Sequence, residues 1–104
     1  MSLIAIDDVA LFDREVAARP AGAVALFTAS WCRPGERLER SLADLPTAVL
    51  RVDVDRTPLL PRRFGVAGLP SLLLLRDGFV AALRCGELSD EDLRVWLEDT
   101  LGSA

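Results

Sequence analysis

The chain has 104 residues, a net charge of −4, two cysteines and no histidine. Lysine, tyrosine, asparagine and glutamine are also absent, and all 12 basic residues are arginine. This inventory excludes a Ser-His-Asp triad, a histidine-ligated metal and a lysine Schiff base, and two cysteines cannot build a closed zinc site or hold a four-cysteine cluster. Cysteine chemistry, carboxylate chemistry or a binding role remain, so we expect no cofactor and no metal.

Size and charge distribution predict one globular domain over residues 1–104. The chain is 51% hydrophobic and 27% charged, as in an ordinary globular domain. Its 104 residues are enough for one hydrophobic core and too few for two. Its arginines are scattered among 16 acidic residues, which argues against a surface for nucleic acid or anionic membrane. No segment approaches the ~18 to 20 apolar residues of a membrane span, and no signal peptide pattern is present. We therefore expect a cytoplasmic protein with reduced cysteines.

The first half of the chain alternates apolar runs with amphipathic segments. Continuous apolar runs predict buried strands, and apolar residues at helical spacing predict helices. In chain order these are a strand at 3–6, a helix from 9 to 16, a strand at 23–27, a helix that follows residue 35, and a strand at 49–54. The succession of strand, helix and strand predicts a right-handed parallel crossover.

The second half adds a hairpin and a closing helix. Residues 57–64 predict a short helix, and strands at 71–75 and 79–83 flank Asp77-Gly78, a strong hairpin signal. Ser89 and Asp92 form a capping box ahead of a helix whose apolar face includes Trp96. The complete order predicts an α/β fold in which a mixed sheet of about five strands is flanked by about four helices.

Cys32 lies where a buried strand gives way to a helix, in the segment SWCRPGE at residues 30–36. Unpaired backbone N–H groups and the positive end of the helix dipole favour thiolate over thiol there. Arg33 adds positive charge, whereas Glu36 opposes it. Local chemistry leaves two readings open, a partly activated thiol and an inert, half-buried cysteine.

The residues ASWCRP at 29–34 resemble the active-site segment of the thioredoxin family, which usually reads W-C-G-P-C-K. The similarity continues in VDVD at 52–55, FGV at 64–66, GLPS at 68–71, the Asp77-Gly78 hairpin and Gly86 ahead of Leu88. These motifs occur in the family's order and cover essentially the whole chain. The resemblance implies a thioredoxin fold and thiol–disulfide exchange with protein thiols or disulfides.

The same resemblance implies a groove beside Cys32 that holds an extended peptide segment. In the family, the backbone before a cis-proline pairs with the bound peptide, and Pro70 matches that position. From the residues alone, Pro70 could equally open a strand, and Trp31 could be a core aromatic. The residues that the resemblance assigns to the groove are Trp31, Arg33, Pro34, Leu69, Pro70 and Gly86.

Two positions depart from the family pattern. Gly35 replaces the second cysteine, so the thiol that normally resolves a mixed disulfide is missing. Leu26 stands where thioredoxins usually carry a buried aspartate that assists proton transfer, and the basic neighbour of that aspartate has a counterpart in Arg51. We expect Arg51 to reach solvent or to pair with an acid elsewhere. Both losses predict weakened disulfide reductase activity.

Cys85, at the end of the last strand, is the remaining thiol. It could resolve, or form a disulfide with, Cys32 if the two Cα atoms lie within ~7 Å, or it could be a small residue that fills a strand position. We interpret Asp53 and Asp55 as solvated acids at a strand end. Two functions remain: a monothiol protein that exchanges thiols through Cys32, with release by an external thiol or Cys85, and a redox-inactive module that binds peptides or proteins.

Overall fold

The computed structural model describes residues 3–45 and 47–101. Strands and helices occur in the predicted order, and most bounds differ from the predicted ones by at most two residues. The helix that was predicted to follow residue 35 begins three residues earlier than expected, at Arg33. In chain order they are β1 (Leu3–Ile6), α1 (Val9–Ala17), β2 (Ala23–Thr28), α2 (Arg33–Leu42), β3 (Val49–Asp53), α3 (Leu59–Phe64), β4 (Ser71–Arg76), β5 (Phe79–Cys85) and α4 (Asp90–Leu101).

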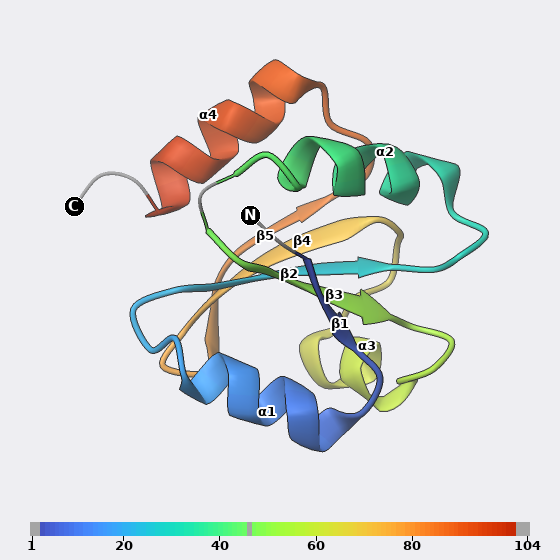
Figure 1. Cartoon of the computed structure of the whole chain (residues 1–104), viewed down its shortest axis with the longest axis vertical. Helices are drawn as coiled ribbons and strands as arrows, with labels where there is room; N and C mark the ends of the chain where they lie inside the picture. The colour runs from blue at the N-terminus through green and yellow to red at the C-terminus, as the bar shows by residue number, and fades with distance from the viewer. Residues whose placement is uncertain (1–2, 46, 102–104) are drawn as a thin grey trace.

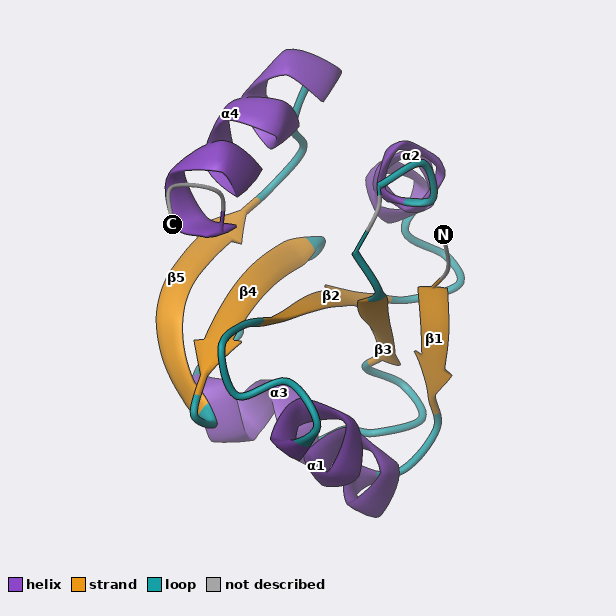
Figure 2. Ribbon diagram, turned by 60° about the vertical axis from the view of Figure 1, so that its left-hand side comes forward, coloured by secondary structure: helices purple, strands orange, loops and turns teal. Residues whose placement is uncertain are grey.

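The strands form one mixed sheet in the order β1-β3-β2-β4-β5. β1, β3 and β2 run parallel, whereas β4 is antiparallel to β2 and β5 is antiparallel to β4. Helices α1 and α3 lie on one face of the sheet, and α2 and α4 lie on the other (Figures 1 and 2). This arrangement confirms the predicted α/β architecture. None of the described helices is both long and apolar enough to cross a membrane.

The central strand β2 is buried along its whole length because both faces of the sheet are covered. Ala23, Ala25 and Phe27 face the core beneath α1 and α3. Val24 and Leu26 face the second core, which α2 and α4 cover. Side chains alternate strictly between faces in a strand, so Thr28 follows Leu26 onto the α2 side. Packing on both faces holds the end of β2 in place, and with it the start of the segment that carries Cys32.

The β4–β5 hairpin turns at Asp77 and Gly78, whose φ angles of 53° and 84° are both positive. A two-residue turn of this kind matches the twist of the flanking strands and is the type that an Asp-Gly pair predicts. β5 is the last strand of the sheet, and Ala82 is its one residue that is not exposed. The apolar side chains of β5 are therefore mostly exposed to solvent.

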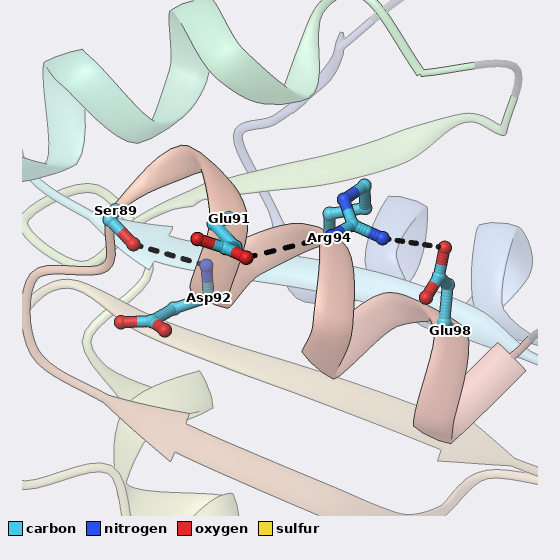
Figure 3. A network of polar contacts seen from close by, with 5 residues as sticks. All are labelled: Ser89, Glu91, Asp92, Arg94 and Glu98. Atoms are coloured by element: carbon cyan, nitrogen blue, oxygen red, sulfur yellow. Dashed lines mark hydrogen bonds and ion pairs between the residues drawn. The ribbon is translucent and has the colours of Figure 1, made fainter.

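At the start of helix α4, Ser89 forms one of the two hydrogen bonds of the predicted capping box (Figure 3). The backbone N–H of Asp92 donates to the Ser89 hydroxyl at 3.1 Å. Arg94 lies between Glu91, at 3.9 Å, and Glu98, at 3.1 Å. Such exposed ion pairs contribute at most ~0.5 kcal/mol each. The helix is held mainly by its apolar face, where Leu93, Trp96 and Leu97 are buried.

Candidate functional site

Cys32 is the residue immediately before helix α2, in the extended conformation of an N-cap. Its N–H donates to the carbonyl oxygen of Ala29 at 3.0 Å, and its own carbonyl accepts from the N–H of Glu36 at 3.1 Å. Pro34 is tolerated in the first turn because N–H groups there have no helical partner. The thiol is 6% exposed and lies at the amino end of the helix, where backbone N–H groups favour negative charge.

Gly35, in the first turn of α2, has no space for a side chain. A Cβ atom at this position would overlap the Thr28 hydroxyl oxygen, and it would lie 3.0 Å from Thr28 Cβ and 3.3 Å from Cys32 Sγ. The Thr28 side chain rises from β2 and is completely buried. Thr28 therefore occupies the space beside Cys32 in which a side chain of residue 35 would begin.

Trp31 projects from the surface beside Cys32, and 66% of it is exposed. Its indole Nε1–H donates to Asp55 Oδ2 at 3.0 Å, which fixes the ring at the exit of β3. The N–H of Asp55 in turn donates to Asp53 Oδ1 at 2.9 Å. The prediction that Asp53 is solvated is wrong, because this residue is 9% exposed and its carboxylate shapes the turn after β3. Arg33 is exposed.

The segment before β4 lies at the same end of the strands as the last residue of β2. Phe27 pairs with Ser71 across these antiparallel strands, so the register brings Pro70 next to Thr28. The Leu69–Pro70 peptide bond is cis. Gly86 donates its N–H to the Pro70 carbonyl oxygen at 2.8 Å and has a φ of 99°. The residues assigned to the groove thus come from three segments that converge at one edge.

Leu69 borders a shallow hollow of about 300 Å³ between α3 and the end of β3. Apolar side chains and prolines form most of its wall, and one arginine lies at its side. The residues that line it are Val54, Pro58, Pro61, Arg62, Val66, Ala67 and Leu69. The site therefore has an apolar surface on the Leu69 side.

Cys85 occupies a different environment from Cys32. It is exposed at the end of β5, opposite Ser71 in β4. Its sulfur packs against Gly68, where an added Cβ would lie 2.7 Å from it. Ser71 follows the alternation of Leu73 and Leu75, so it faces the α1 and α3 side of the sheet. Cys32 precedes α2, which covers the opposite face. The two cysteines are both free thiols.

The substituted acid position is fully apolar. Leu26 is completely buried and pairs in register with Arg51 of β3. Arg51 Nε donates to Glu39 Oε1 of α2 at 2.6 Å, and both side chains are about three-quarters buried. Arg51 thus pairs with an acid elsewhere, one of the two alternatives that the sequence left open. Glu39 lies nearly two turns along α2 from Cys32, so this pair ties α2 to β3 rather than serving the thiol.

The Thioredoxin family model matches residues 4–99. The chain belongs to the thioredoxin family. It is 36% identical to the thioredoxin of Rhodospirillum rubrum over 78 residues, which are 69% of this chain and 75% of that protein. It is 37% identical to the thioredoxin of Chlamydia muridarum over 76 residues, which are 68% of this chain and 74% of that protein.

Solved structures confirm the thioredoxin fold. A point mutant of a thioredoxin from Halobacterium salinarum NRC-1 superposes with a TM-score of 0.85 at 24% identity, over 99% of this chain and 94% of that one. Thiol–disulfide redox chemistry on protein thiols and disulfides is the function of this family. Within this family site, Gly35 leaves Cys32 without a thiol neighbour in the helix.

Sequence reasoning missed two residues at this thioredoxin-family site. The sequence placed Thr28 in the loop between the strand and the helix. In the structure Thr28 ends β2, and its hydroxyl oxygen lies where a Cβ of residue 35 would be. Asp55 is exposed, as predicted, but its hydrogen bond to the Trp31 indole was not foreseen. Alternation along β2 carried a signal for Thr28, because a polar residue in phase with Val24 and Leu26 must lie under α2. The sequence alone carried no comparable signal for Asp55.

Proposed function

We propose that this chain is a monothiol thioredoxin-like protein that exchanges thiols through Cys32. The observation that carries the proposal is the packing at the amino end of α2, where Cys32 is the N-cap residue and Thr28 fills the space beside Gly35. A mixed disulfide at Cys32 therefore meets no thiol from the helix that could resolve it. An external thiol performs this step.

The exchange runs in two balanced steps. The Cys32 thiolate attacks one sulfur of a protein disulfide, a new S–S bond forms, and the other sulfur leaves as a thiolate that takes a proton from water. A low-molecular-weight thiol of the glutathione type then attacks the mixed disulfide. When the attack falls on the substrate sulfur, Cys32 leaves as a thiolate and the substrate sulfur becomes bound to the external thiol. When it falls on the Cys32 sulfur, the reduced substrate leaves, and a second molecule of the external thiol then frees the Cys32 thiolate and forms the disulfide of the external thiol.

The partner is an extended segment of a protein that carries a disulfide or a thiol. The exposed Trp31 ring, the Leu69 hollow and the backbone ahead of Pro70 support this part of the proposal. Extended segments bind by backbone hydrogen bonds, with apolar pockets for alternate side chains. We place the protein in the cytoplasm, whose glutathione both keeps thiols reduced and supplies the external thiol. Nucleic acid is not a partner in this proposal because the net charge is −4.

Cys85 is not the resolving thiol in this proposal. Its sulfur lies against Gly68 on the α1 and α3 side of the sheet, whereas Cys32 begins the helix on the other side. Resolution by Cys85 would require its sulfur to leave Gly68, which it contacts from the end of β5. That end is held by the Ser71 pairing and by the hydrogen bond from Gly86 to Pro70.

The test follows reduction of a protein disulfide by glutathione in the presence of the wild-type chain, Cys32→Ser and Cys85→Ser. Without glutathione, the wild type should accumulate a mixed disulfide that mass spectrometry maps to Cys32, and added glutathione should release it. Cys32→Ser should form no adduct, and Cys85→Ser should form and release it as the wild type does. Activity that survives in Cys32→Ser would overturn the proposal, and loss of release in Cys85→Ser would assign the resolving step to Cys85.

The same variants test the alternative of a redox-inactive binding module. Binding of a partner peptide that carries serine in place of its cysteines would be measured with wild-type protein and Cys32→Ser. Equal and strong binding, together with no adduct in the wild type, would support the binding module and contradict thiol exchange. The proposal expects weak binding of this peptide and tight capture of its cysteine form, because the covalent bond supplies most of the affinity.

A further inference from the structure

The hydroxyl group of Thr28 is a buried polar group without a hydrogen-bond partner in the described part of the chain. Thr28 is fully buried, and its backbone carbonyl accepts from the N–H of Val54 at 2.9 Å. Other buried hydroxyls are satisfied: Thr57 donates to the Asp53 carbonyl at 2.8 Å, and Ser71 donates to the Gly68 carbonyl at 2.6 Å. Most buried polar groups in proteins are paired, so an unpaired one calls for an explanation.

Thr28 Oγ1 points into the space beside the Cys32 sulfur. A Cβ atom built on Gly35 would overlap this oxygen and would lie 3.3 Å from Cys32 Sγ. The hydroxyl and the sulfur therefore border the same small volume beneath the first turn of α2. Glycine at position 35 places no side chain between the hydroxyl and the sulfur, whereas any larger residue would separate the two groups or displace Thr28.

A neutral thiol and a thiolate offer this hydroxyl different partners. A thiol sulfur is a weak acceptor, whereas a thiolate is an anion that forms a charge-assisted hydrogen bond with an O–H donor. A hydroxyl hydrogen rotates freely about the Cβ–Oγ1 bond. The oxygen and the sulfur form no hydrogen bond in this structure, so the bond to the thiolate also requires the two groups to move closer when the charge develops. The donor is also shielded from water, because Thr28 is fully buried and Cys32 is 6% exposed. Such shielding strengthens the hydrogen bond.

We propose that Thr28 donates its hydroxyl hydrogen to the Cys32 sulfur in the thiolate state. The inference rests on the proposed function, because it concerns the sulfur that carries out the exchange. The hydrogen bond stabilises the attacking thiolate, and it stabilises the same thiolate when the external thiol releases the mixed disulfide. Thr28 thereby gives Cys32 a donor inside the protein that does not depend on a second thiol in the helix.

Thr28→Val tests the inference, because valine keeps the shape of threonine and lacks the donor. Each variant is made in a Cys85→Ser background so that one thiol is followed, and the rate of alkylation by iodoacetamide is measured from mildly acidic to basic pH. Thr28→Val should lower the rate at neutral pH by about three- to tenfold. At high pH, where every thiol is ionised, its rate should equal that of the parent or exceed it by up to about threefold, because a thiolate without the donor is the stronger nucleophile. Thr28→Ser, which keeps the hydroxyl, should retain most of the parental rate.

The profile separates a donor from a packing residue. Loss of packing would lower the thermal unfolding temperature without moving the profile along the pH axis, whereas loss of the donor moves the profile to higher pH. We expect Thr28→Val to unfold at the same or a higher temperature, since it removes an unpaired buried hydroxyl. Superimposable profiles for Thr28→Val and the parent would overturn the inference.

Failure of the inference and failure of the proposed function remain distinguishable, because alkylation needs no protein disulfide. A shifted Thr28→Val profile in a protein that forms no mixed disulfide would support the donor and contradict the exchange function. Unshifted profiles in a protein that does form Cys32 adducts would contradict the donor and leave the exchange function supported.

Discussion

The two cysteines of this chain lie in contrasting regions of one fold. Cys32 is 6% exposed at the amino end of α2, with buried neighbours on the strand below. Cys85 is exposed at the end of β5, an edge strand whose side chains are mostly in contact with solvent. The surroundings of Cys32 are fixed by packing on both faces of the sheet, whereas those of Cys85 are fixed chiefly by backbone hydrogen bonds.

A glycine packs against a side chain in each region, which makes the contrast measurable. At Gly35 the obstacle to a Cβ is Thr28, a branched side chain held within the core. At Gly68 the obstacle is the Cys85 sulfur, the end of a side chain that can rotate into solvent. Adding a Cβ atom should therefore lower the free energy of unfolding much more at position 35 than at position 68. Neighbouring groups can tune a thiol where they are rigid, which favours Cys32 as the reactive one.

The largest effect is expected for Gly35→Cys, which restores the family's C-x-x-C pattern. The new Cβ would overlap the hydroxyl oxygen of Thr28, a branched side chain that is completely buried. We expect the free energy of unfolding to fall by about 3 kcal/mol, as for severe overpacking of a core. Urea denaturation under reducing conditions measures this loss.

A double variant provides the control for this substitution. Thr28→Ala combined with Gly35→Cys removes the overlapping oxygen, so it should recover more than half of the lost stability. The introduced thiol should then form a disulfide with Cys32 under mild oxidation, which thiol counting detects. Wild-type stability of the single Gly35→Cys variant would show that the amino end of α2 is not closely packed.

A smaller effect is expected for Gly86→Ala on the Cys85 side. No atom lies within 4 Å of the position that a Cβ would take, so the cost arises from the φ of 99° alone. A non-glycine residue with such a φ is strained by about 1 to 2 kcal/mol. Thermal unfolding measures the loss. Gly86→Asn should lose less stability than Gly86→Ala, because asparagine tolerates positive φ better than alanine does. Equal stability of Gly86→Ala and wild type would contradict the positive φ at this position.

The Glu39–Arg51 pair on the α2 side should contribute about 1 kcal/mol to the free energy of unfolding. Glu39→Ala would remove this contribution. Both side chains are about three-quarters buried, and the N–O distance is 2.6 Å, so the charges are poorly screened. The matched control is Glu98→Ala, whose pair with Arg94 is exposed and should contribute under ~0.5 kcal/mol. Equal losses in the two variants, measured by urea denaturation, would contradict the difference in burial.

The smallest effect is expected for Gly68→Ala. The added carbon would lie 2.7 Å from the Cys85 sulfur, which can rotate away into solvent. We expect a loss below ~0.5 kcal/mol, and none in a Cys85→Ala background, as for other changes at exposed positions. A loss as large as that of Gly35→Cys would mean that the Cys85 side is packed as tightly as the Cys32 side, which would remove the contrast.

The fold was largely predictable from the sequence because its signals are local. The apolar run at 23–27, the Asp77-Gly78 turn and the Ser89–Asp92 capping box each specify a short element through nearby residues. Which strand lies at the edge was not predictable. The apolar residues of β5 resemble those of a buried strand, yet Phe79 is 78% exposed. Edge position depends on the order of strands in the sheet, and hydrophobicity does not encode that order.

The candidate site was predictable in part. The segment around Cys32 placed the thiol before a helix, as the structure does. The contact between Thr28 and Gly35 depends on how closely α2 approaches β2, a distance that arises from packing of the whole core. The Trp31–Asp55 hydrogen bond joins residues 24 positions apart, and sequence patterns do not specify a single side-chain pairing over such a separation.

The tethered Trp31 indole gives this protein an internal optical reporter. The chain has two tryptophans and no tyrosine, so its near-ultraviolet emission comes from Trp31 and Trp96. Trp31 is 66% exposed beside Cys32, whereas Trp96 is 9% exposed in the core beneath α4. A partner that covers Trp31 should shift its fluorescence to shorter wavelengths while Trp96 remains constant as a reference. Occupancy of Cys32 can thus be followed in real time without a dye.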